Sequence, residues 1–346
     1  MAQPLPPDID PTLADAAIVI RADASAHIGV GHAMRCLALA EAWIDLGGQV
    51  VFASAELPDA IAARIAATGA RVATVTTPAD TAALARDVGA RFAVVDGYHL
   101  GAAEQEALSM TGACLLVIDD RGETATQAAD LVLNQDASAT EELYSELDAK
   151  LLLGLSYVLL RREFRTAASI RHVPEVARHV LVSFGGADPA NLTPIALEAL
   201  ASLDGLDVFV IAGMANPHQL VVPPDARATI WIVQSVDDMA AQMRRADLAV
   251  VAAGSTCWEL AACGVPMVAV AAADDQLAIT ESLGQLGLGV PLTLDGFGVA
   301  SLRSIIASLA RDEIWRGHMA RKGREVIDGQ GALRVCAALR AAGGAR

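Results

Sequence analysis

The sequence predicts an α/β protein of two Rossmann-like, doubly wound domains with an interdomain cleft. Short β-branched runs alternate with helical patterns throughout the chain, which is typical of α/β folds. These runs are bounded by Gly and lack apolar–polar alternation, as expected of parallel strands that are buried on both faces. The length of 346 residues is sufficient for two domains, each with its own core.

The first half of the chain contains six expected strands with helices between them. The strands are expected at Ala17–Arg21, Val50–Ala53, Val72–Val75, Ala93–Asp96, Cys114–Ile118 and Leu131–Leu133. The clearest helical patterns here are Met34–Leu46 and Ala60–Ala67. Repetition of strand and helix gives a parallel sheet with right-handed crossovers.

The second half repeats this pattern. Its strands are expected at His179–Phe184, Asp207–Ala212, Thr229–Val233, Leu248–Ala252 and Met267–Ala271. Helices are expected at Pro194–Leu203, Asp238–Arg244, Thr256–Cys263 and, near the end of the chain, Trp315–Ala342.

The boundary between the two domains is predicted at Leu155–Pro174, where the composition changes to a group of arginines followed by proline. We therefore expect an N-terminal domain over residues 17–160 and a C-terminal domain over residues 175–346. Residues 1–16 are rich in proline and lack the charged and apolar regions of a signal peptide, so we expect a flexible tail.

Composition excludes several classes of function. The net charge of −16 argues against a nucleic-acid partner, because binding to phosphates needs a basic surface. No apolar run approaches the roughly 20 residues that a membrane helix needs, so no insertion into a membrane is expected. The five cysteines are scattered without the spacing of a metal or disulfide framework. We therefore expect a cytoplasmic protein with no metal site.

The first strand is followed by a loop over Asp23–Arg35 that contains Gly29 and Gly31. Glycines allow tight turns and close approach to a ligand. A dinucleotide fingerprint would need a third glycine where Met34 stands, so no nicotinamide cofactor is expected.

His32 lies in this loop where the next helix begins. The positive end of the helix dipole disfavours the imidazolium form, and a neutral imidazole in a polar cleft can act as a general base. The alternative is a structural role in capping the helix or supporting the turn. Asp23 could orient the imidazole or a water molecule, or form an Asx turn.

Two loops in the second half could bind a diphosphate. The first contains Gly185, Gly186, Asp188 and Asn191, and it leads from a buried strand to a helix N-terminus whose backbone amides suit an anion. The alternative is that Asp188, which precedes Pro189, is only the N-cap of that helix.

The second of these loops contains Gly254, Ser255 and Thr256, and Glu259 follows one helical turn later. The amides at this helix start could bind phosphate, and the Glu259 carboxylate could accept the two hydroxyls of a ribose. A capping box formed by Ser255 or Thr256 with Glu259 is the alternative.

Three further features lie at strand ends. Asp274, Asp275 and Gln276 could contact a sugar, or could simply form a solvated helix start. Tyr98 offers a phenol and a ring face that could pack on a sugar, and Asp119 and Asp120 could be turn residues.

In these features the chain resembles the UDP-2,4-diacetamido-2,4,6-trideoxy-β-L-altropyranose hydrolases of pseudaminic acid biosynthesis. The matching N-terminal residues are Arg21-Ala22-Asp23-Ala24-Ser25, Ile28-Gly29-Val30-Gly31-His32, Met34-Arg35, Asp96, Tyr98, Asp119-Asp120, Leu133-Asn134, Gly154-Leu155-Ser156-Tyr157, Leu160-Arg161 and Glu163-Phe164. The matching C-terminal residues are Gly185-Gly186, Asp188, Asn191-Leu192, Ser255, Glu259-Leu260 and Gln276. They occur in order over roughly Ala17 to Gly289.

The resemblance implies a metal-independent, cofactor-free hydrolase with the GT-B fold, similar to the N-acetylglucosaminyltransferase of peptidoglycan synthesis. It implies that His32 is the base that directs water to the anomeric carbon with inversion, and that Tyr98 lies at the sugar or at its attacking water. It also implies that the C-terminal domain binds UDP through Glu259 and the loops of Ser255 and Gly186, and that the last helical segment packs back across the cleft. Family members commonly have Asn where this chain has Asp275.

Two other functions agree with the same residues. A GT-B glycosyltransferase would use the same UDP-sugar site with an alcohol or a lipid-linked acceptor in place of water. A nucleotide-sugar-binding protein without catalysis would need no base in the position of His32. The N-terminal half shows no apolar or basic patch for docking to a membrane, which favours the hydrolase.

Overall fold

The computed structural model describes residues 16–25, 27–165, 172–213 and 216–344. The predicted tail thus lies almost wholly outside the described residues, as does part of the predicted linker. The described chain divides into two compact units. The N-terminal unit contains the residues up to Arg162 together with the segment from Gly329 onward, and the C-terminal unit is Glu163–Asp328.

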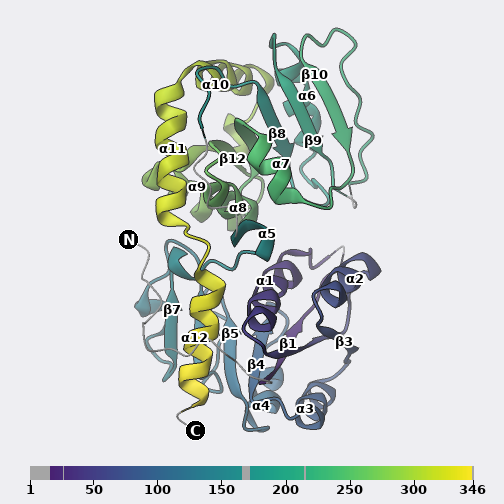
Figure 1. Cartoon of the computed structure of the whole chain (residues 1–346), viewed down its shortest axis with the longest axis vertical. Helices are drawn as coiled ribbons and strands as arrows, with labels where there is room; N and C mark the ends of the chain where they lie inside the picture. Colours follow the sequence, from purple (N-terminus) through teal and green to yellow (C-terminus); the bar gives the residue numbers. More distant parts are fainter. Residues whose placement is uncertain (1–15, 26, 166–171, 214–215, 345–346) are drawn as a thin grey trace. The chain divides into compact units, whose positions relative to one another are not determined.

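The N-terminal unit is built on a seven-stranded parallel sheet with the order β3-β2-β1-β4-β5-β6-β7 (Figure 1). Its strands are β1 (Ala17–Ala22), β2 (Gln49–Ser54), β3 (Arg71–Thr74), β4 (Phe92–Asp96), β5 (Cys114–Ile118), β6 (Leu131–Asn134) and β7 (Lys150–Leu153). Its helices are α1 (Gly31–Asp45), α2 (Asp59–Ala67), α3 (Pro78–Asp87), α4 (Ala102–Ser109) and α12 (Gly331–Gly343).

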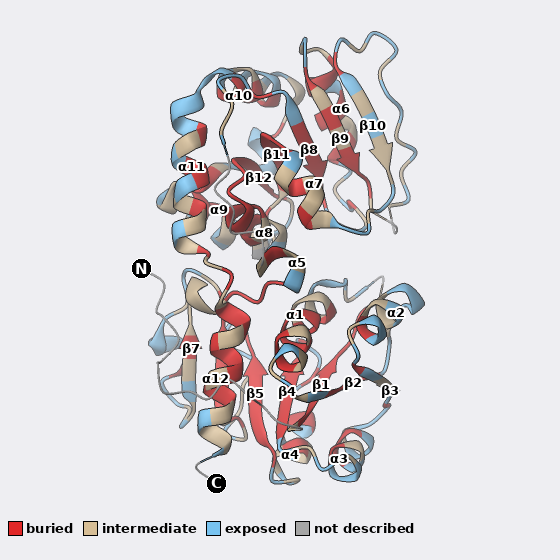
Figure 2. Cartoon of the chain, in the orientation of Figure 1, coloured by how far each residue is buried: buried red, intermediate tan, exposed pale blue. Residues whose placement is uncertain are grey.

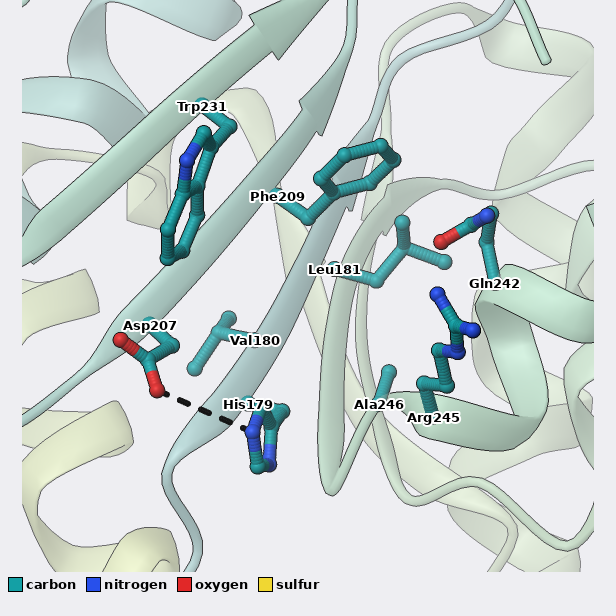
Figure 3. Close-up of a pocket in the computed structure, with 9 residues that line it drawn as sticks. All are labelled: His179, Val180, Leu181, Asp207, Phe209, Trp231, Gln242, Arg245 and Ala246. Carbon is teal, nitrogen blue, oxygen red and sulfur yellow. Dashed lines mark ion pairs between the residues drawn. The ribbon is translucent and has the colours of Figure 1, made fainter.

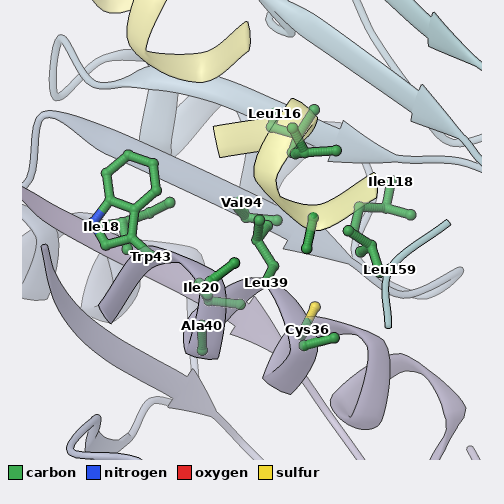
Figure 4. Close-up of a cluster of buried hydrophobic side chains, with 14 of the residues drawn as sticks. Ile18, Ile20, Cys36, Leu39, Ala40, Trp43, Val94, Leu116, Ile118 and Leu159 are labelled. Atoms are coloured by element: carbon green, nitrogen blue, oxygen red, sulfur yellow. The ribbon is translucent and has the colours of Figure 1, made fainter. Parts of the chain in front are cut away.

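Both faces of this sheet are covered by apolar side chains. Successive residues of a strand point to opposite faces, and in β1 both sets are apolar. Ile18 and Ile20 pack with Leu39 and Trp43 of α1 and with residues of α12 on one face (Figure 4). Val19 belongs to the core on the other face, together with residues of α3 and α4. This two-sided burial explains why the strands show no apolar–polar alternation.

The C-terminal unit repeats the design with a six-stranded parallel sheet of order β10-β9-β8-β11-β12-β13. Its strands are β8 (His179–Ser183), β9 (Asp207–Ile211), β10 (Thr229–Val233), β11 (Leu248–Ala252), β12 (Met267–Ala271) and β13 (Gly289–Thr293). Its helices are α6 (Thr193–Ala201), α7 (Met239–Arg245), α8 (Ser255–Cys263), α9 (Leu277–Leu286), α10 (Val299–Arg311) and α11 (Glu313–Val326), and the short α5 (Arg162–Arg165) spans the division between the units. The central strands are buried, as they are in the first sheet (Figure 2).

The structure differs from the sequence prediction at the last strand of each sheet. Neither β7 nor β13 was expected. Both are edge strands in which all residues but one are at least partly exposed, and β13 contains Pro291, which an edge strand tolerates because one side of it needs no hydrogen bonds. The composition of these segments therefore does not separate them from loops.

The end of the chain also differs from the prediction. The single helix expected over Trp315–Ala342 is two helices, α11 and α12, because the backbone leaves the helix at Ile327 and turns through Gly329 with a φ of 76°. The C-terminal domain was expected over residues 175–346, with its last helical segment packing back. In the structure the C-terminal unit ends at Asp328, and α12 packs on α1 in the N-terminal unit. Within the described ranges, every helix is too short or too polar to cross a membrane.

Candidate active site

The polar residues of the N-terminal unit gather at the carboxyl edge of its sheet, where ligands bind in open α/β sheets. Helix α1 starts in the loop after β1 and carries His32 and Arg35. Asp96 is the last residue of β4, and Asp120 follows the end of β5. The topology places β1, β4 and β5 side by side, so these side chains meet.

His32 and Asp96 form a hydrogen-bonded pair. The His32 Nδ1 and Asp96 Oδ1 atoms are 2.8 Å apart, and Asp96 is completely buried. Burial alone would raise the pKa of Asp96, but the Arg35 guanidinium and His32 lower it to about 2. An ionised carboxylate only accepts hydrogen bonds, so it selects the imidazole form with a proton on Nδ1. The lone pair of Nε2 then remains for a substrate.

Arg35 fixes this pair by joining two strand ends. Its Nε and Nη2 atoms each donate to Asp96 at 2.6 Å, and its Nη1 donates to both oxygens of Asp120 at 2.7 and 2.8 Å. Burial disfavours the charged guanidinium, but the two carboxylates raise the pKa of Arg35 well above its usual value. Arg35 therefore holds the Asp96 carboxylate in place, and its predicted contact with substrate stays a prediction.

Tyr98 lies against His32. The two rings are 5.0 Å apart with an edge-to-face angle of 88°, and the Arg121 guanidinium lies 4.4 Å from the Tyr98 ring. Burial and the neighbouring Asp120 raise the pKa of Tyr98 to about 12, so the phenol stays protonated and donates to Asp120 at 3.3 Å. About half of the Tyr98 side chain is exposed, which leaves ring surface for a ligand.

The sequence left open whether Asp23 orients His32, orients a water molecule or forms an Asx turn, and in the structure Asp23 has partners other than His32. Its carboxylate instead accepts hydrogen bonds from Arg21 at 2.6 Å, from Ser54 at 2.8 Å and from the backbone N–H of Ala55 at 2.7 Å, and it pairs with His99 Nε2 at 2.7 Å. Burial would raise the pKa of Asp23, but these partners hold it well below its usual range. Asp96, at the end of the neighbouring strand, takes the orienting position.

The loop before His32 depends on glycine. Gly29 has a φ of 80°, which favours glycine, and its N–H donates to Ser25 O at 2.9 Å to close the loop. A Cβ on Gly31, the first residue of α1, would meet no atom within 4 Å, so the space over this helix start is open.

The C-terminal unit also places its predicted loops at the carboxyl edge of a sheet. The loop after β8 turns through Gly185, with a φ of 84°, and through Asp188 and Asn191, whose φ values of 43° and 53° are unusual for residues other than glycine. The Asp188 carboxylate is 1% exposed and accepts from the N–H groups of Leu192 and Thr193, both at 2.9 Å. Asp188 therefore shapes this loop from inside, and helix α6 begins at Thr193 instead of at Pro189.

Helix α8 begins without a side-chain cap. Its N-cap is Gly254, so the alternative of a capping box formed by Ser255 or Thr256 with Glu259 is wrong. Because no side chain fills the cap, the first-turn amides of Ser255 and Thr256 remain available to an anion. Glu259 lies one turn further along the same helix and is partly exposed.

The loop after β12 contains the last predicted residues. Asp275 falls in a short 3₁₀ helix, Asp274–Gln276, and its side chain lies outside the described part of the structure. The Gln276 Oε1 accepts from the N–H of Ala272 at 2.9 Å, which fixes the side chain against its own loop.

Three groups at this sheet edge were not expected to take part in the site, although Asp120 had been considered as a turn residue. Asp120 binds Arg35 and Tyr98, and His99 binds Asp23. Asp136, in the loop after β6, lies near Asp120, and burial together with that like charge raises its pKa to about 6. Their positions after buried strands were the available signal, because parallel strands bring such residues to one edge.

A separate hollow of about 270 Å³ lies in the C-terminal unit, on a face of the sheet (Figure 3). His179 and Asp207, 3.7 Å apart, begin β8 and β9, so this hollow reaches the amino ends of the strands. Trp231 and Phe209 form its apolar wall. It is therefore distinct from the loops at the carboxyl edge.

Comparisons with known proteins agree with this architecture. No family model matches the chain. The spore coat polysaccharide biosynthesis protein SpsG of Bacillus subtilis (strain 168) is 25% identical over 240 residues, which are 66% of this chain and 70% of that protein.

Two solved structures are similar over nearly the whole chain. MurG of Acinetobacter baumannii has a TM-score of 0.62 at 17% identity and covers 90% of this chain and 95% of its own. The spinosyn forosaminyltransferase SpnP has a TM-score of 0.71 at 13% identity and covers 95% of this chain and 99% of its own. At these identities the likeness concerns the fold. The predicted fold class of two Rossmann-like domains is confirmed, and it is the GT-B fold of these glycosyltransferases.

Proposed function

We propose that this chain is an enzyme of polysaccharide or glycan synthesis that transfers the sugar of a UDP-sugar to a hydroxyl group. The observation that carries the proposal is the buried Asp96 bound to His32 Nδ1, at the ligand-binding edge of the sheet in a chain with the GT-B fold. The similarity to SpsG and to glycosyltransferase structures supports transfer to an acceptor.

The chemistry assigned to His32 is general-base catalysis. Its Nε2 removes the proton of the attacking hydroxyl, and the oxygen forms a bond to the anomeric carbon. The bond from that carbon to the diphosphate oxygen breaks, and its electron pair leaves with UDP. A single displacement of this kind inverts the configuration. Asp96 stabilises the resulting imidazolium, and a positioned base of this type contributes roughly 100- to 10,000-fold to the rate.

We assign UDP to the loops of the C-terminal unit. The uncapped first turn of α8, at Gly254 and Ser255, supplies amides to the diphosphate, and the turn at Gly185 and Gly186 brings more backbone near it. These donors stabilise the charge that develops on the leaving group. Glu259 accepts the ribose hydroxyls in this proposal.

In this proposal the remaining predicted residues position the sugar or maintain the shape of the binding loops. Gln276, held by the N–H of Ala272, faces the sugar, and Asp188 and Asn191 maintain the shape of the diphosphate loop. Asp275 is left without an assigned contact.

Hydrolysis is the second candidate, with water in place of the acceptor. It is favoured by the ordered motifs shared with the hydrolases of UDP-2,4-diacetamido-2,4,6-trideoxy-β-L-altropyranose, above all the loop from Arg21 to Arg35. The base and the bond that breaks are the same in both reactions, and the product is then the free sugar of pseudaminic acid biosynthesis. A protein that only binds nucleotide sugars would have no use for the His32–Asp96 pair.

The test is UDP release from a panel of UDP-sugars that includes the diacetamido-altrose donor, with and without alcohol and sugar acceptors. Transfer predicts release that depends on the acceptor, together with a glycosylated product. Release without an acceptor, with label from heavy-oxygen water in the free sugar, would establish hydrolysis instead. Absence of release under every condition, with UDP still bound, would contradict both reactions.

A further inference from the structure

A cavity of about 480 Å³ opens in the N-terminal unit beside the loop that carries His32. It is lined by the ends of β1 and β2, by the segment after β3 and by the start of α4. Its volume lies in the usual range for small-molecule sites. Of the site residues predicted from the sequence, only Asp23 lines this cavity.

The turn after β4 links the cavity to the His32 site. Tyr98 packs its ring on His32, whereas the next residue, His99, turns to Asp23 at the cavity wall. Gly97 permits this turn, because its φ is 156° and a Cβ there would come within 3.0 Å of the His99 ring. One short turn therefore supplies a side chain to each of two adjoining sites.

The pair of His99 and Asp23 mirrors that of His32 and Asp96. His99 Nε2 is 2.7 Å from Asp23 Oδ2, and the low pKa of Asp23 keeps this carboxylate ionised, so Nε2 carries the proton. The side chain of His99 is 44% exposed, so Nδ1 is the ring atom left for a ligand.

A buried ion pair with unused hydrogen-bonding capacity also lies in the wall. Arg21 and Glu104 are each only 5% exposed, yet the Arg21 Nε and Glu104 Oε1 atoms are 3.5 Å apart. Within the described residues neither atom has a hydrogen-bond partner. Buried charged groups in native proteins normally have such partners. The two atoms are shut off from solvent and face each other, so they set the charge of the cavity wall and do not themselves reach a ligand.

The charges of the wall define the class of ligand. Asp23, Glu56 and Glu104 are acidic, whereas Arg21 is the basic side chain among the lining residues besides His99. An anionic ligand such as a phosphate ester would be repelled. A neutral or amine-bearing ligand would find acceptors in the carboxylates of Glu56 and Glu104 and in His99 Nδ1, whereas the Asp23 carboxylate is already occupied by protein donors.

We propose that this cavity binds the pyranose ring of a neutral sugar or an amino sugar. The identification as a pyranose rests on the proposed function, since acceptors in the wall of a cavity of this size suit the hydroxyls of a sugar ring. The ring belongs either to the acceptor or to the donor's own sugar, and both have the same recognition chemistry.

The experiment measures binding of D-glucosamine, N-acetyl-D-glucosamine and glucose 6-phosphate to the full chain by titration. The two neutral or amino sugars should bind, and the phosphate should bind about tenfold more weakly or not at all. Glu104→Gln and His99→Gln should each weaken sugar binding about tenfold while UDP binding stays unchanged. Glu106→Gln, on the exposed side of the same helix, is the matched control and should change neither.

The melting temperature of each variant shows whether it is folded, and His99→Gln, at a half-exposed position, serves if Glu104→Gln does not fold. Undetectable sugar binding, equal binding of the phosphate, or an equal loss in Glu106→Gln would overturn the proposal. A UDP-release assay then separates the two sources. An acceptor sugar raises UDP release, and a sugar in the place of the donor ring competes with the donor.

The failure of this proposal is distinct from failure of the proposed function. If His32→Gln abolishes UDP release while the variants of the cavity leave sugar binding intact, the cavity assignment is wrong and the proposed reaction stands.

Discussion

At the scale of residues, the central feature is the contrast between two histidine–carboxylate pairs at one sheet edge. His32 meets Asp96 through Nδ1, and His99 meets Asp23 through Nε2. The sequence drew attention to both His32 and Asp23, and orienting His32 was one of the roles that it left open for Asp23. Sequence proximity suggested that pairing, whereas the parallel order β1, β4, β5 brings Asp96 closer than a neighbour in the same loop.

Asp96→Asn separates the catalytic part of this pair from its effect on stability. An amide cannot hold the imidazole with its proton on Nδ1 as a carboxylate does, so kcat for UDP release should fall about 100- to 10,000-fold. The pKa of Asp96 is lowered in the folded state to about 2, so its contribution to stability is present above pH 4. It is lost as the pH falls through 2.

The measurement is the free energy of unfolding of both proteins at several pH values. The advantage of the wild type over Asp96→Asn should shrink by about 2 kcal/mol between pH 5 and pH 2, because a shift of one pKa unit corresponds to about 1.4 kcal/mol. An advantage that does not vary with pH would show that Asp96 is not held in its ionised form by Arg35 and His32.

Asp136 should have the opposite dependence on pH. Burial and Asp120 raise its pKa to about 6, whereas the unfolded chain releases this proton near pH 4. The wild type therefore loses stability as the pH rises from 4 to 6, and Asp136→Asn does not. The free energy of unfolding, measured by chemical denaturation at pH 4 and pH 7.5, should rise for the variant relative to the wild type at the higher pH. An equal difference at both pH values would mean that Asp136 titrates normally.

At the scale of elements, the central strands were predictable and the edges were not. Cys114–Ile118 is an uninterrupted apolar run bounded by loop residues, and its predicted and observed limits coincide. The edge strand β13 contains glycine and proline and is half exposed, so only its pairing with β12 identifies it. Long-range hydrogen bonds of this kind leave no local pattern in a sequence.

The positions of the helix starts in the site were predictable from the sequence, but the residues that cap these helices were not. The sequence located the loop before α8, but Ser255 and Thr256 looked equally suited to capping the helix or to flanking a phosphate. The observed N-cap at Gly254 shows that neither side chain caps the helix. Capping geometry depends on backbone angles, which residue types restrict but do not determine.

Gly254→Ala tests the α8 start as the phosphate site. Gly254 has an extended backbone that any residue adopts, and a Cβ there would meet no atom within 4 Å, so the protein should fold normally. The added methyl group takes up open space next to the Ser255 amide, so it should crowd a diphosphate bound there and raise the Kd for UDP about tenfold, equivalent to about 1.4 kcal/mol. Calorimetric titration with UDP measures this change.

Gly317→Ala is the matched control, because a Cβ at this position in α11 also meets no neighbour. It should leave the Kd for UDP unchanged. Equal affinities of Gly254→Ala and the wild type for UDP would show that the diphosphate does not bind at the start of α8.

At the scale of the whole molecule, the two units have separate cores although the chain leaves the first and returns to it. Helix α12 buries Val335, Cys336 and Leu339 in the core of the N-terminal unit, next to α1. The sequence showed the amphipathic helix, but nothing local in it identifies the sheet against which the helix packs. The similarity to solved GT-B structures covers both units.

In a chain truncated after Asp328, the N-terminal unit should therefore unfold, whereas the C-terminal unit should stay folded. Removing one large buried side chain costs about 2–5 kcal/mol, and α12 supplies several, which exceeds the stability of an ordinary domain. The truncated chain should still bind UDP and show one cooperative unfolding transition for the remaining unit, followed by circular dichroism. UDP release at the wild-type rate by this chain would refute the assignment of the base to the N-terminal unit.

The role of His32 as the general base is tested most directly by measuring the turnover of His32→Gln together with its affinity for UDP. If His32 is the base, kcat for UDP release falls by about 100-fold or more, because glutamine retains hydrogen bonding but cannot accept the proton, while the Kd for UDP stays within about twofold. A variant that releases UDP at the wild-type rate would show that His32 is not the base.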